Sequence, residues 1–256
     1  MKISVDNKIQ NGYSLDLSKI IELSFETYKK TFLISGIAFI FLFIVTLILY
    51  VGYFGLLFGF SNFTDTITQI ESNASNVTTQ IANMLVGAVF SALVGPFFAG
   101  SIYVNHLSKT NKEFGLASIF DFYKGDKVKD ILINQFIITL FVNVIAAFLV
   151  LINFPIIGGL VQIIVMLFTF YSIPLIVFAD QNYMDAITKS ALLFLKQPFV
   201  IIVSIIIGIL GSLIGIIVLC IGIFFTVPFY FSINYAVYNE AIGFEKTSPI
   251  DEIGIE

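Results

Sequence analysis

Few side chains in this sequence could carry out acid–base, nucleophilic or metal chemistry. His106 is the only histidine and Cys220 the only cysteine. His106 has no second imidazole and no carboxylate partner at helical spacing, so neither a metal site nor a catalytic pair is predicted there. Cys220 is expected to be a small apolar side chain rather than a nucleophile. Asp180 and Asp185 flank a predicted helix, where solvated capping is the favoured role. The chain is therefore not expected to be an enzyme, and no cofactor is predicted.

Amide side chains inside the apolar runs are the better candidates for a functional or packing role. They are Asn143 near the middle of a predicted span, Asn134 and Gln135 nearer its cytoplasmic end, and Gln162 in the outer half of the next span. Such amides could line a polar path for a solute, or they could join helices by hydrogen bonds of about 0.6–2 kcal/mol. We favour the second interpretation, because no Asp, Glu or Lys lies at mid-depth to form the proton relay of a carrier.

Composition indicates a membrane protein. Of the 256 residues, 58% are hydrophobic and 12% are charged, whereas a soluble domain is about 45–50% apolar and about 25% charged. All 13 basic residues are lysine and the net charge is −4, so nucleic acid is not an expected partner. Membrane lipid is the expected partner, and a membrane protein or a second copy of the chain are further alternatives.

Six stretches of the chain are expected to cross the membrane, since a span needs about 20 apolar residues. Residues 199–238 carry no charge and are long enough for two crossings with a tight turn near Gly215–Gly222. The predicted spans are about 32–58, 81–107, 131–152, 156–179, 199–217 and 220–240. The predicted fold class is therefore an all-α integral membrane protein, with residues 1–256 forming a single membrane domain.

The positions of the lysines predict the orientation of these spans. Five lysines precede the first span, five follow the second, two follow the fourth and one follows the sixth, while the other three connections carry none. Lysine-rich connections stay in the cytoplasm. The chain is thus expected in the cytoplasmic (inner) membrane, with both termini cytoplasmic and the six spans paired as three hairpins.

Each predicted hairpin is preceded by an amphipathic segment and ends with a proline-bearing span. The segments carry apolar residues on one helical face, which is typical of helices that lie at the membrane interface. They are residues about 15–30, 116–124 and 183–196. The prolines are Pro96, Pro174 and Pro228. We interpret this as a threefold internal repeat in which each proline kinks its helix and frees a carbonyl for a neighbour. The alternative is that proline is simply common in membrane helices.

Local signals predict two helix caps and one packing stripe. Ser14 is expected to cap the first amphipathic segment, with Asp16 in its first turn, and Asn182 is expected to cap the third. A stripe of small residues is expected to pack inside the bundle rather than to form a dimer face. It consists of Ser204, Gly208, Gly211 and Gly215.

The later part of the sequence resembles bacterial six-span membrane families. PFYFSINYAVYNEAIG, residues 228–243, is similar to their last-helix signature, and FADQNYMDAITKSALLFLKQPF, residues 178–199, is similar to the cytoplasmic element before the fifth span. The group includes the membrane domain joined to some glycerophosphodiester phosphodiesterases and many stand-alone homologues of unknown function. The phosphodiesterase barrel, with its carboxylates and histidine, is absent from this sequence. The resemblance therefore implies location and fold but no activity, and it carries over no functional residue.

Two functions stay open at this point. The favoured one is a non-enzymatic membrane module that organises lipid or a membrane partner protein, because the sequence offers amphipathic segments and lacks reactive groups. The alternative is a small-solute transporter or channel, because kinked helices and amides could form a path. A polar lining converging on Asn143 would favour the alternative.

Overall fold

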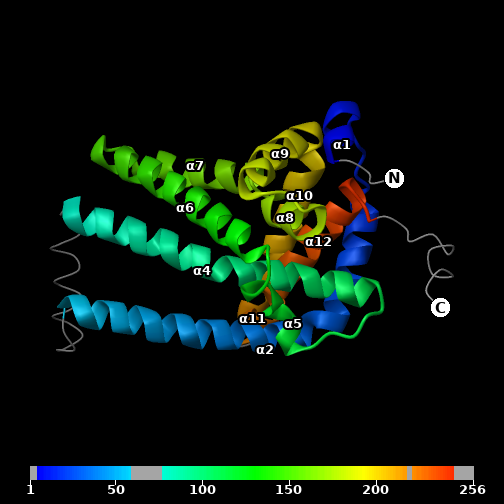
Figure 1. Cartoon of the computed structure of the whole chain (residues 1–256), viewed down its shortest axis with the longest axis horizontal. Coiled ribbons are helices and arrows are strands. Elements are labelled where there is room, and N and C mark those ends of the chain that lie inside the picture. The colour runs from blue at the N-terminus through cyan, green and yellow to red at the C-terminus, as the bar shows by residue number, and fades with distance from the viewer. Residues whose placement is uncertain (1–4, 59–76, 218–220, 245–256) are drawn as a thin grey trace.

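The computed structural model describes residues 5–58, 77–217 and 221–244, which form helices joined by turns, with no strand among them. Figure 1 labels the helices. They are α1 (Val5–Asn11), α2 (Leu17–Phe58), α4 (Val77–Lys109), α5 (Leu116–Ile119), the 3₁₀ helix η1 (Asp121–Tyr123), α6 (Val128–Leu151), α7 (Pro155–Phe168), α8 (Ser172–Ala179), α9 (Tyr183–Lys196), α10 (Pro198–Leu213), the 3₁₀ helix η2 (Ile214–Ile216), α11 (Gly222–Thr226) and α12 (Pro228–Ala241).

Five helical stretches are long and apolar enough to cross a membrane, which indicates a membrane-embedded protein. They are Leu17–Tyr53, Thr78–Lys109, Val128–Val150, Ile156–Ala179 and Pro198–Ile217. The sixth predicted span, 220–240, is instead divided into α11 and α12 by a turn at Val227, directly before Pro228. Neither piece has the length of a span by itself. η2 ends at Ile216 and α11 begins at Gly222, and residues 218–220 of the predicted turn lie outside the described residues.

The first amphipathic segment and the first span are one helix, not two. Residues predicted as 15–30 and 32–58 belong to the single helix α2, whose 42 residues extend about 63 Å at 1.5 Å per residue. Figure 1 shows its dark-blue beginning turning away from the long remainder. Side-chain hydroxyls of Ser24, Thr27 and Thr31 donate to carbonyls one turn back, at 2.6, 3.0 and 3.0 Å. Such bonds compete with the backbone ladder and often bend helices.

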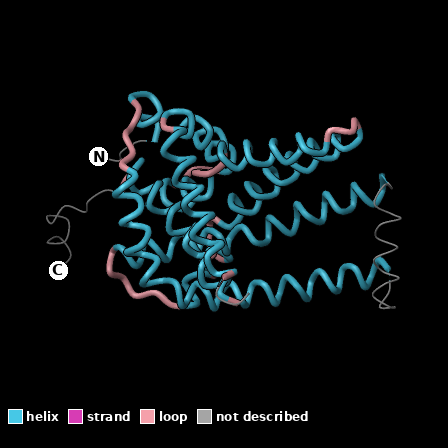
Figure 2. The backbone as a smooth tube through the Cα atoms, turned by 180° about the vertical axis from the view of Figure 1, so that it is seen from behind, coloured by secondary structure: helices cyan, strands magenta, loops and turns pink. Residues whose placement is uncertain are grey.

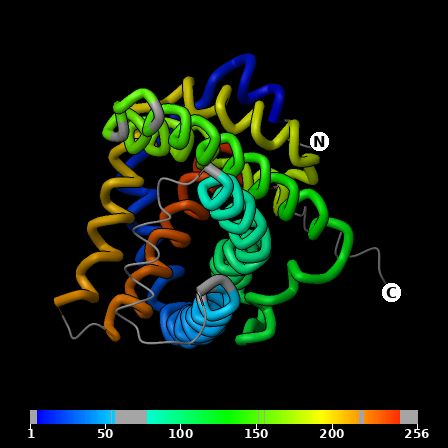
Figure 3. The backbone as a smooth tube through the Cα atoms, turned by 90° about the vertical axis from the view of Figure 1, so that its left-hand side faces the viewer, coloured from blue at the N-terminus to red at the C-terminus, as the bar shows by residue number. Residues whose placement is uncertain are grey.

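The third helix pair runs in a different direction from the other two. Figure 3, which looks along the long axis, shows α10 and α11–α12 from the side, whereas the long part of α2 is seen end-on. α12 instead lies antiparallel to the beginning of α2, since Lys19 Nζ is 3.8 Å from Glu240 Oε1 and the Tyr28 hydroxyl donates to the Phe225 carbonyl at 3.0 Å. The predicted arrangement of three like hairpins about a threefold axis is therefore not seen, because α12 follows the bent beginning of α2.

The packed core and the exposed spans occupy opposite ends of the molecule. Figure 2 shows from behind that the turn between α6 and α7 lies far from the end where α1, α9 and α12 gather. The largest fully buried side chains include Phe97, Tyr171, Tyr235 and Tyr238, which belong to one core cluster with residues of α1 and α9. The elements that carry the described lysines also meet there: α1, the beginning of α2, the end of α4 with the loop after it, the beginning of α6, and α9. Residues 31–58, 77–105 and 131–168 carry no charge.

Small residues allow backbones to approach closely inside the bundle, as predicted. A Cβ atom at Gly211 would lie 2.5 Å from the Phe229 ring, and one at Gly215 would overlap the Gly222 carbonyl. Ser204 and Gly208 of the same stripe are also buried. The stripe on α10 and η2 therefore packs against α11 and α12. A Cβ atom at Gly100 would likewise overlap the Ile119 carbonyl, so α5 lies directly on α4.

One predicted cap is confirmed and one is wrong. The Asn182 side chain accepts hydrogen bonds from the Met184 and Asp185 backbone N–H groups, at 3.0 and 2.9 Å, and so caps α9. At α2 the cap is Asp16 rather than Ser14, because the Asp16 carboxylate accepts the Ser18 N–H at 2.9 Å. A carboxylate in this position also interacts favourably with the helix dipole.

The three prolines occupy different helical positions. Pro96 lies inside α4, Pro174 is the third residue of α8, and Pro228 is the first residue of α12. Pro174 and Pro228 thus begin new helices, where a missing N–H costs nothing, instead of kinking a continuous helix as predicted. The helix break in the fourth predicted span lies at Thr169–Tyr171, just before Pro174.

A shared device nevertheless accompanies all three prolines. A carbonyl three or four residues before each proline accepts a side-chain hydrogen bond from another element, and in the case of Phe170 it is the carbonyl whose usual N–H partner the proline lacks. The bonds run from Tyr123 Oη to the Leu93 carbonyl (2.9 Å), from Asn234 Nδ2 to the Phe170 carbonyl (2.9 Å) and from Tyr28 Oη to the Phe225 carbonyl (3.0 Å). Tyr28 and Tyr123 both belong to predicted amphipathic segments.

Candidate functional site

His106 lies in a cluster of aromatic rings and not in a catalytic constellation. Its ring centroid is 4.3 Å from that of Phe244 and 5.4 Å from that of Phe178, and its Nδ1 is 3.4 Å from the Tyr235 hydroxyl. Among the described residues, no group of three or more His, Cys, Asp and Glu side chains could hold a metal ion. Cys220 lies outside the described residues. His106 is therefore packed as part of an aromatic core.

The two carboxylates singled out in the sequence have structural partners. Asp180 follows α8 in a left-handed conformation (φ 51°), and its Oδ1 lies 2.6 Å from Lys127 Nζ. Lys127 also donates to the Val177 carbonyl at 2.6 Å, so it neutralises the end of α8. Asp185 Oδ2 accepts a hydrogen bond from Asn182 at 2.8 Å. Asp185 thus takes part in the cap of α9, the role favoured from the sequence, whereas the Asp180 carboxylate pairs with Lys127.

Two of the four candidate amides join helices. Asn143 Nδ2 on α6 donates to the Met84 carbonyl of α4 at 3.2 Å. Asn134 is fully buried; it donates to the Tyr183 carbonyl at 3.4 Å and accepts from Ser172 Oγ at 3.2 Å. Asn134 thus ties α6 to both α8 and α9, and neither amide belongs to a polar lining centred on Asn143.

The other two amides differ in their surroundings. Gln162 is exposed on α7. Gln135 is half-buried and lines a cavity of about 270 Å³ between α4, α6, α7, α8 and α12. Apolar side chains make up most of the lining: Phe98, Ile102, Ile138, Met166, Phe170, Ile173 and Phe231. Its polar members are Gln135, Thr169, Ser172, Tyr230 and Asn234. This cavity is the candidate functional site.

The break between α7 and α8 builds one wall of the cavity. Pro174 has no N–H for the Phe170 carbonyl four residues before it, and Asn234 Nδ2 of α12 donates to that carbonyl instead, at 2.9 Å. Ser190 of α9 donates to the neighbouring Phe168 carbonyl at 2.7 Å and accepts the Tyr171 N–H at 3.0 Å. The opened backbone is therefore held in place by two other helices.

Three polar groups of the lining have unused hydrogen-bonding capacity. Asn234 is 5% exposed, and its Oδ1 is buried with no hydrogen-bond partner among the described residues. The Gln135 amide and the Tyr230 hydroxyl make no hydrogen bond to any residue that the structure describes. Thr169 and Ser172, by contrast, donate to the Val165 carbonyl and to Asn134. A buried polar atom without a partner costs about 1–3 kcal/mol; Asn234 Oδ1 has almost no accessible surface, so the cavity itself offers unpaired polar groups only through Gln135 and Tyr230.

Sequence reasoning found Gln135 but missed Asn234 and Tyr230. Both lie in PFYFSINYAVY, where the proline and the aromatic residues dominated the interpretation. The available signal was a lone amide six residues after Pro228, in a stretch without charge. What the sequence could not supply was its partner, since the Phe170 carbonyl lies 64 positions away in the chain.

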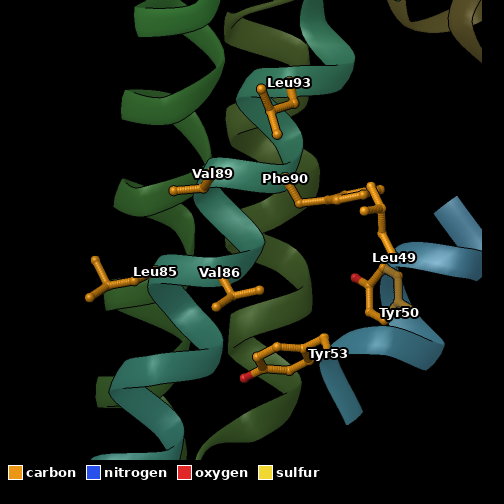
Figure 4. Close-up of a pocket in the computed structure, with 8 residues that line it drawn as sticks. All are labelled: Leu49, Tyr50, Tyr53, Leu85, Val86, Val89, Phe90 and Leu93. Atoms are coloured by element: carbon orange, nitrogen blue, oxygen red, sulfur yellow. The ribbon is translucent and has the colours of Figure 1, made fainter. Parts of the chain in front are cut away.

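A second hollow is an apolar groove between the long parts of α2 and α4. It has a volume of about 330 Å³ and is lined by Leu49, Tyr50, Tyr53, Leu85, Val86, Val89, Phe90 and Leu93. Figure 4 shows Val86 and Phe90 directed from α4 toward α2. The Tyr53 hydroxyl donates to Asn83 Oδ1 at 2.8 Å and so bridges the two helices near their far ends. No charged side chain lines this groove.

Comparison with known proteins adds no relative. The chain matches no family model, no curated protein and no solved structure. The resemblance to bacterial six-span membrane families therefore stays a prediction.

Proposed function

We propose that this chain is a non-enzymatic integral membrane module that binds membrane lipid along its exposed spans. The observation that carries the proposal is the groove between α2 and α4, which has a volume of about 330 Å³, an apolar lining, and walls formed by two helices long enough to cross a membrane. Val89 and Leu93 on its rim are 50% and 51% exposed. A lipid chain is the natural occupant of such a hollow in a bilayer, because the surrounding solvent is itself hydrocarbon.

The proposal includes the topology expected from the lysines. Six crossings would place both termini in the cytoplasm of an inner-membrane protein, with α10 and α11–α12 as a short, strongly tilted last pair. Two observations support this. The uncharged turn at residues 152–154 lies at the opposite end from the lysine-bearing elements, and α12 ends beside the beginning of α2. The amphipathic helix α9 keeps Met184 and Leu195 exposed, at 51% and 58%, as an interfacial helix would.

A second function, the transport of a small solute, is favoured by the few polar side chains, Gln135 among them, in the otherwise apolar cavity. Asn143 argues against a continuous polar path for a solute, because its side-chain amide already donates a hydrogen bond to the Met84 carbonyl. The resemblance to stand-alone members of six-span families implies no activity. It therefore agrees equally well with a transporter and with a lipid-binding module.

Fluorescence quenching by brominated lipid tests the lipid-binding groove. The chain contains no tryptophan, so a single engineered tryptophan reports one position. Val89→Trp should be quenched strongly in vesicles of brominated phosphatidylcholine relative to unbrominated vesicles. The matched control is Phe97→Trp, which replaces a ring that is 0% exposed in the core of the same helix and should be quenched weakly.

Equal quenching at both positions would mean that the core described here is open to lipid. Weak quenching at Val89→Trp would mean that protein, and not lipid, covers the groove. Either result would contradict the proposal.

A further inference from the structure

We propose that Lys29 and Lys196 each bind the headgroup of an anionic phospholipid at the membrane interface. Each lysine is exposed, has no carboxylate partner among the described residues, and lies between exposed apolar side chains. The inference rests on the proposed lipid-binding module, since the chain must lie in a bilayer, and it adds the class of lipid. It does not require lipid to fill the groove between α2 and α4.

Lys29 lies on the exposed side of the beginning of α2. Phe25, one turn before it, is 46% exposed, and Phe32 and Leu33, one turn after it, are 41% and 54% exposed. Side chains three and four residues apart on a helix are neighbours, so the ammonium group projects from an apolar patch. A lysine in such surroundings keeps its methylene groups with the hydrocarbon while its charge reaches the polar headgroups.

Lys196 repeats this arrangement at the end of α9. Leu192, one turn before it, is 46% exposed, and Phe199, three residues after it at the beginning of α10, is 77% exposed. The beginning of α2 and α9 both belong to the lysine-rich end of the molecule (Figure 1). Lys196 also lies in the last turn of α9, where the helix dipole favours a cation. Lys29 lies inside a helix and has no such role, so the shared feature is the apolar surroundings.

Other lysines of the same two helices already have anionic partners. Lys30 Nζ lies 3.4 Å from Glu26 Oε1, and Lys189 Nζ lies 2.9 Å from Asp6 Oδ1. The two proposed lipid-binding lysines face no such carboxylate in the part of the chain that the structure describes. The phosphate of a lipid with net negative charge supplies the missing anion, because anionic membrane surfaces attract nearby lysines. A zwitterionic lipid carries its own cation beside the phosphate and should bind less tightly.

Quenching by brominated lipid measures the lipid preference at each lysine, because the chain contains no tryptophan of its own. Phe32→Trp and Phe199→Trp each place one indole beside a proposed lysine. The vesicles are mixtures of phosphatidylglycerol and phosphatidylcholine in which one lipid or the other carries the bromine, and the ratio of quenching gives the local preference.

We expect both indoles to report a preference of about fivefold for phosphatidylglycerol, the factor for about 1 kcal/mol per lysine near an anionic surface. Lys29→Gln should abolish the preference at Phe32→Trp. Lys196→Gln should abolish it at Phe199→Trp. Both lysines are exposed and unpaired, so these variants should fold like the parent chain.

The paired lysines provide matched controls. Lys30→Gln, read at Phe32→Trp, removes the same charge from the same helix and should leave the preference unchanged. Lys189→Gln, read at Phe199→Trp, should do the same. Sodium chloride should weaken the preference by screening. Glycerol phosphate at equal ionic strength should have no larger effect, because the ligand is a lipid headgroup and not a free anion.

Four outcomes would overturn the proposal. They are weak quenching by both lipids, equal quenching by both lipids, an equal loss of preference in Lys29→Gln and Lys30→Gln, and displacement by glycerol phosphate beyond the salt control. Failure of the groove is a separate result: Val89→Trp would then be quenched weakly, while the preference beside the two lysines would persist.

Discussion

The lysine-rich end and the long apolar spans are built from similar residues but use them in opposite ways. In α12, 11 of the 14 residues are buried by other helices. In the stretch Val128–Val150 of α6, only 11% of the most apolar window is buried. The first region packs protein against protein, while the second presents its side chains outward. Apolar composition alone therefore does not indicate where the core lies.

Polar side chains follow this division. At the packed end, Ser232 Oγ donates to Asn105 Oδ1 at 2.7 Å, and Ser24 Oγ reaches the Ser232 carbonyl at 3.4 Å. Along the spans, polar contacts between helices are sparser, as with Asn143 and with the pair Thr139 and Ser91, which lie 2.7 Å apart. Helices that must pack on each other in lipid gain specificity from such bonds. We therefore expect substitutions to cost more at the packed end.

The largest effect is expected from a pair of glycine substitutions. A Cβ atom at Gly100 would overlap the Ile119 carbonyl, whereas nothing lies within 4 Å of one at Gly52. Gly100→Ala should destabilise the chain by about 3 kcal/mol or more, the upper range for overpacking, because backbone and not a flexible side chain must move. Gly52→Ala should be neutral or stabilising by up to about 1 kcal/mol.

Unfolding in mixed micelles, followed by circular dichroism, measures both glycine variants. If Gly100→Ala were as stable as Gly52→Ala, α5 would not lie directly on α4.

A smaller difference is expected between two amides of α6. Asn134→Leu removes two bonds and leaves the buried Ser172 hydroxyl without its acceptor, so a loss of about 1–3 kcal/mol is expected. Asn143→Leu removes one bond to a half-buried site and should cost about 0.5–2 kcal/mol.

The same unfolding assay ranks the two amide variants. A larger loss of stability in Asn143→Leu than in Asn134→Leu would contradict the expectation that substitutions cost more at the packed end. Loss of solute uptake without loss of stability in Asn143→Leu would favour a transporter.

The sequence was sufficient where local rules decide the structure. Helical periodicity, the Asn182 cap and the charge-free runs follow from residues close to one another in the chain, and these predictions agree with the structure. The continuity of α2 was missed because its bent beginning contacts a segment far away in the sequence: the Tyr28 hydroxyl bonds the Phe225 carbonyl of α11, 197 positions later. The division of the last predicted span was missed because a proline can either kink a helix or begin one, and in the structure Pro228 is the first residue of α12.

The cavity illustrates the same limit. Gln135 was a candidate because an amide in a span is unusual. Asn234 becomes informative only when its partner at Phe170 and the break before Pro174 are known. Sequence periodicity does not reveal which carbonyl a proline leaves free to a distant helix.

The smallest effect is expected from alkaline pH at the packed end. Burial raises the pKa of the Tyr13 phenol from 10.0 to about 12, although its hydrogen bond to Tyr171 lowers it. The folded chain thus holds this proton to higher pH than the unfolded chain does. The stabilisation is complete below pH about 10 and is lost as the pH rises toward about 12.

Tyr13→Phe provides the comparison for that pH effect. It loses the 2.7 Å bond to the Leu193 carbonyl and should be less stable at neutral pH. The difference in midpoint of unfolding between the two chains should shrink as the pH rises from about 10 to about 12. A difference that stays constant over this range would show that Tyr13 is not buried as described.

The central proposal is that the lysine-rich end faces the cytoplasm and that the uncharged turns face outward. Cysteine labelling with a membrane-impermeant maleimide on intact cells tests it most directly, in a Cys220→Ser background. Asn153→Cys, in the turn between α6 and α7, should be labelled from outside, and Lys112→Cys, in the turn after α4, only after the cells are permeabilised. Ile217→Cys, 84% exposed beside the last turn, should behave like Asn153→Cys if α10 and α11–α12 form a crossing pair. Labelling of Lys112→Cys in intact cells, or equal labelling of Asn153→Cys and Lys112→Cys, would contradict the account.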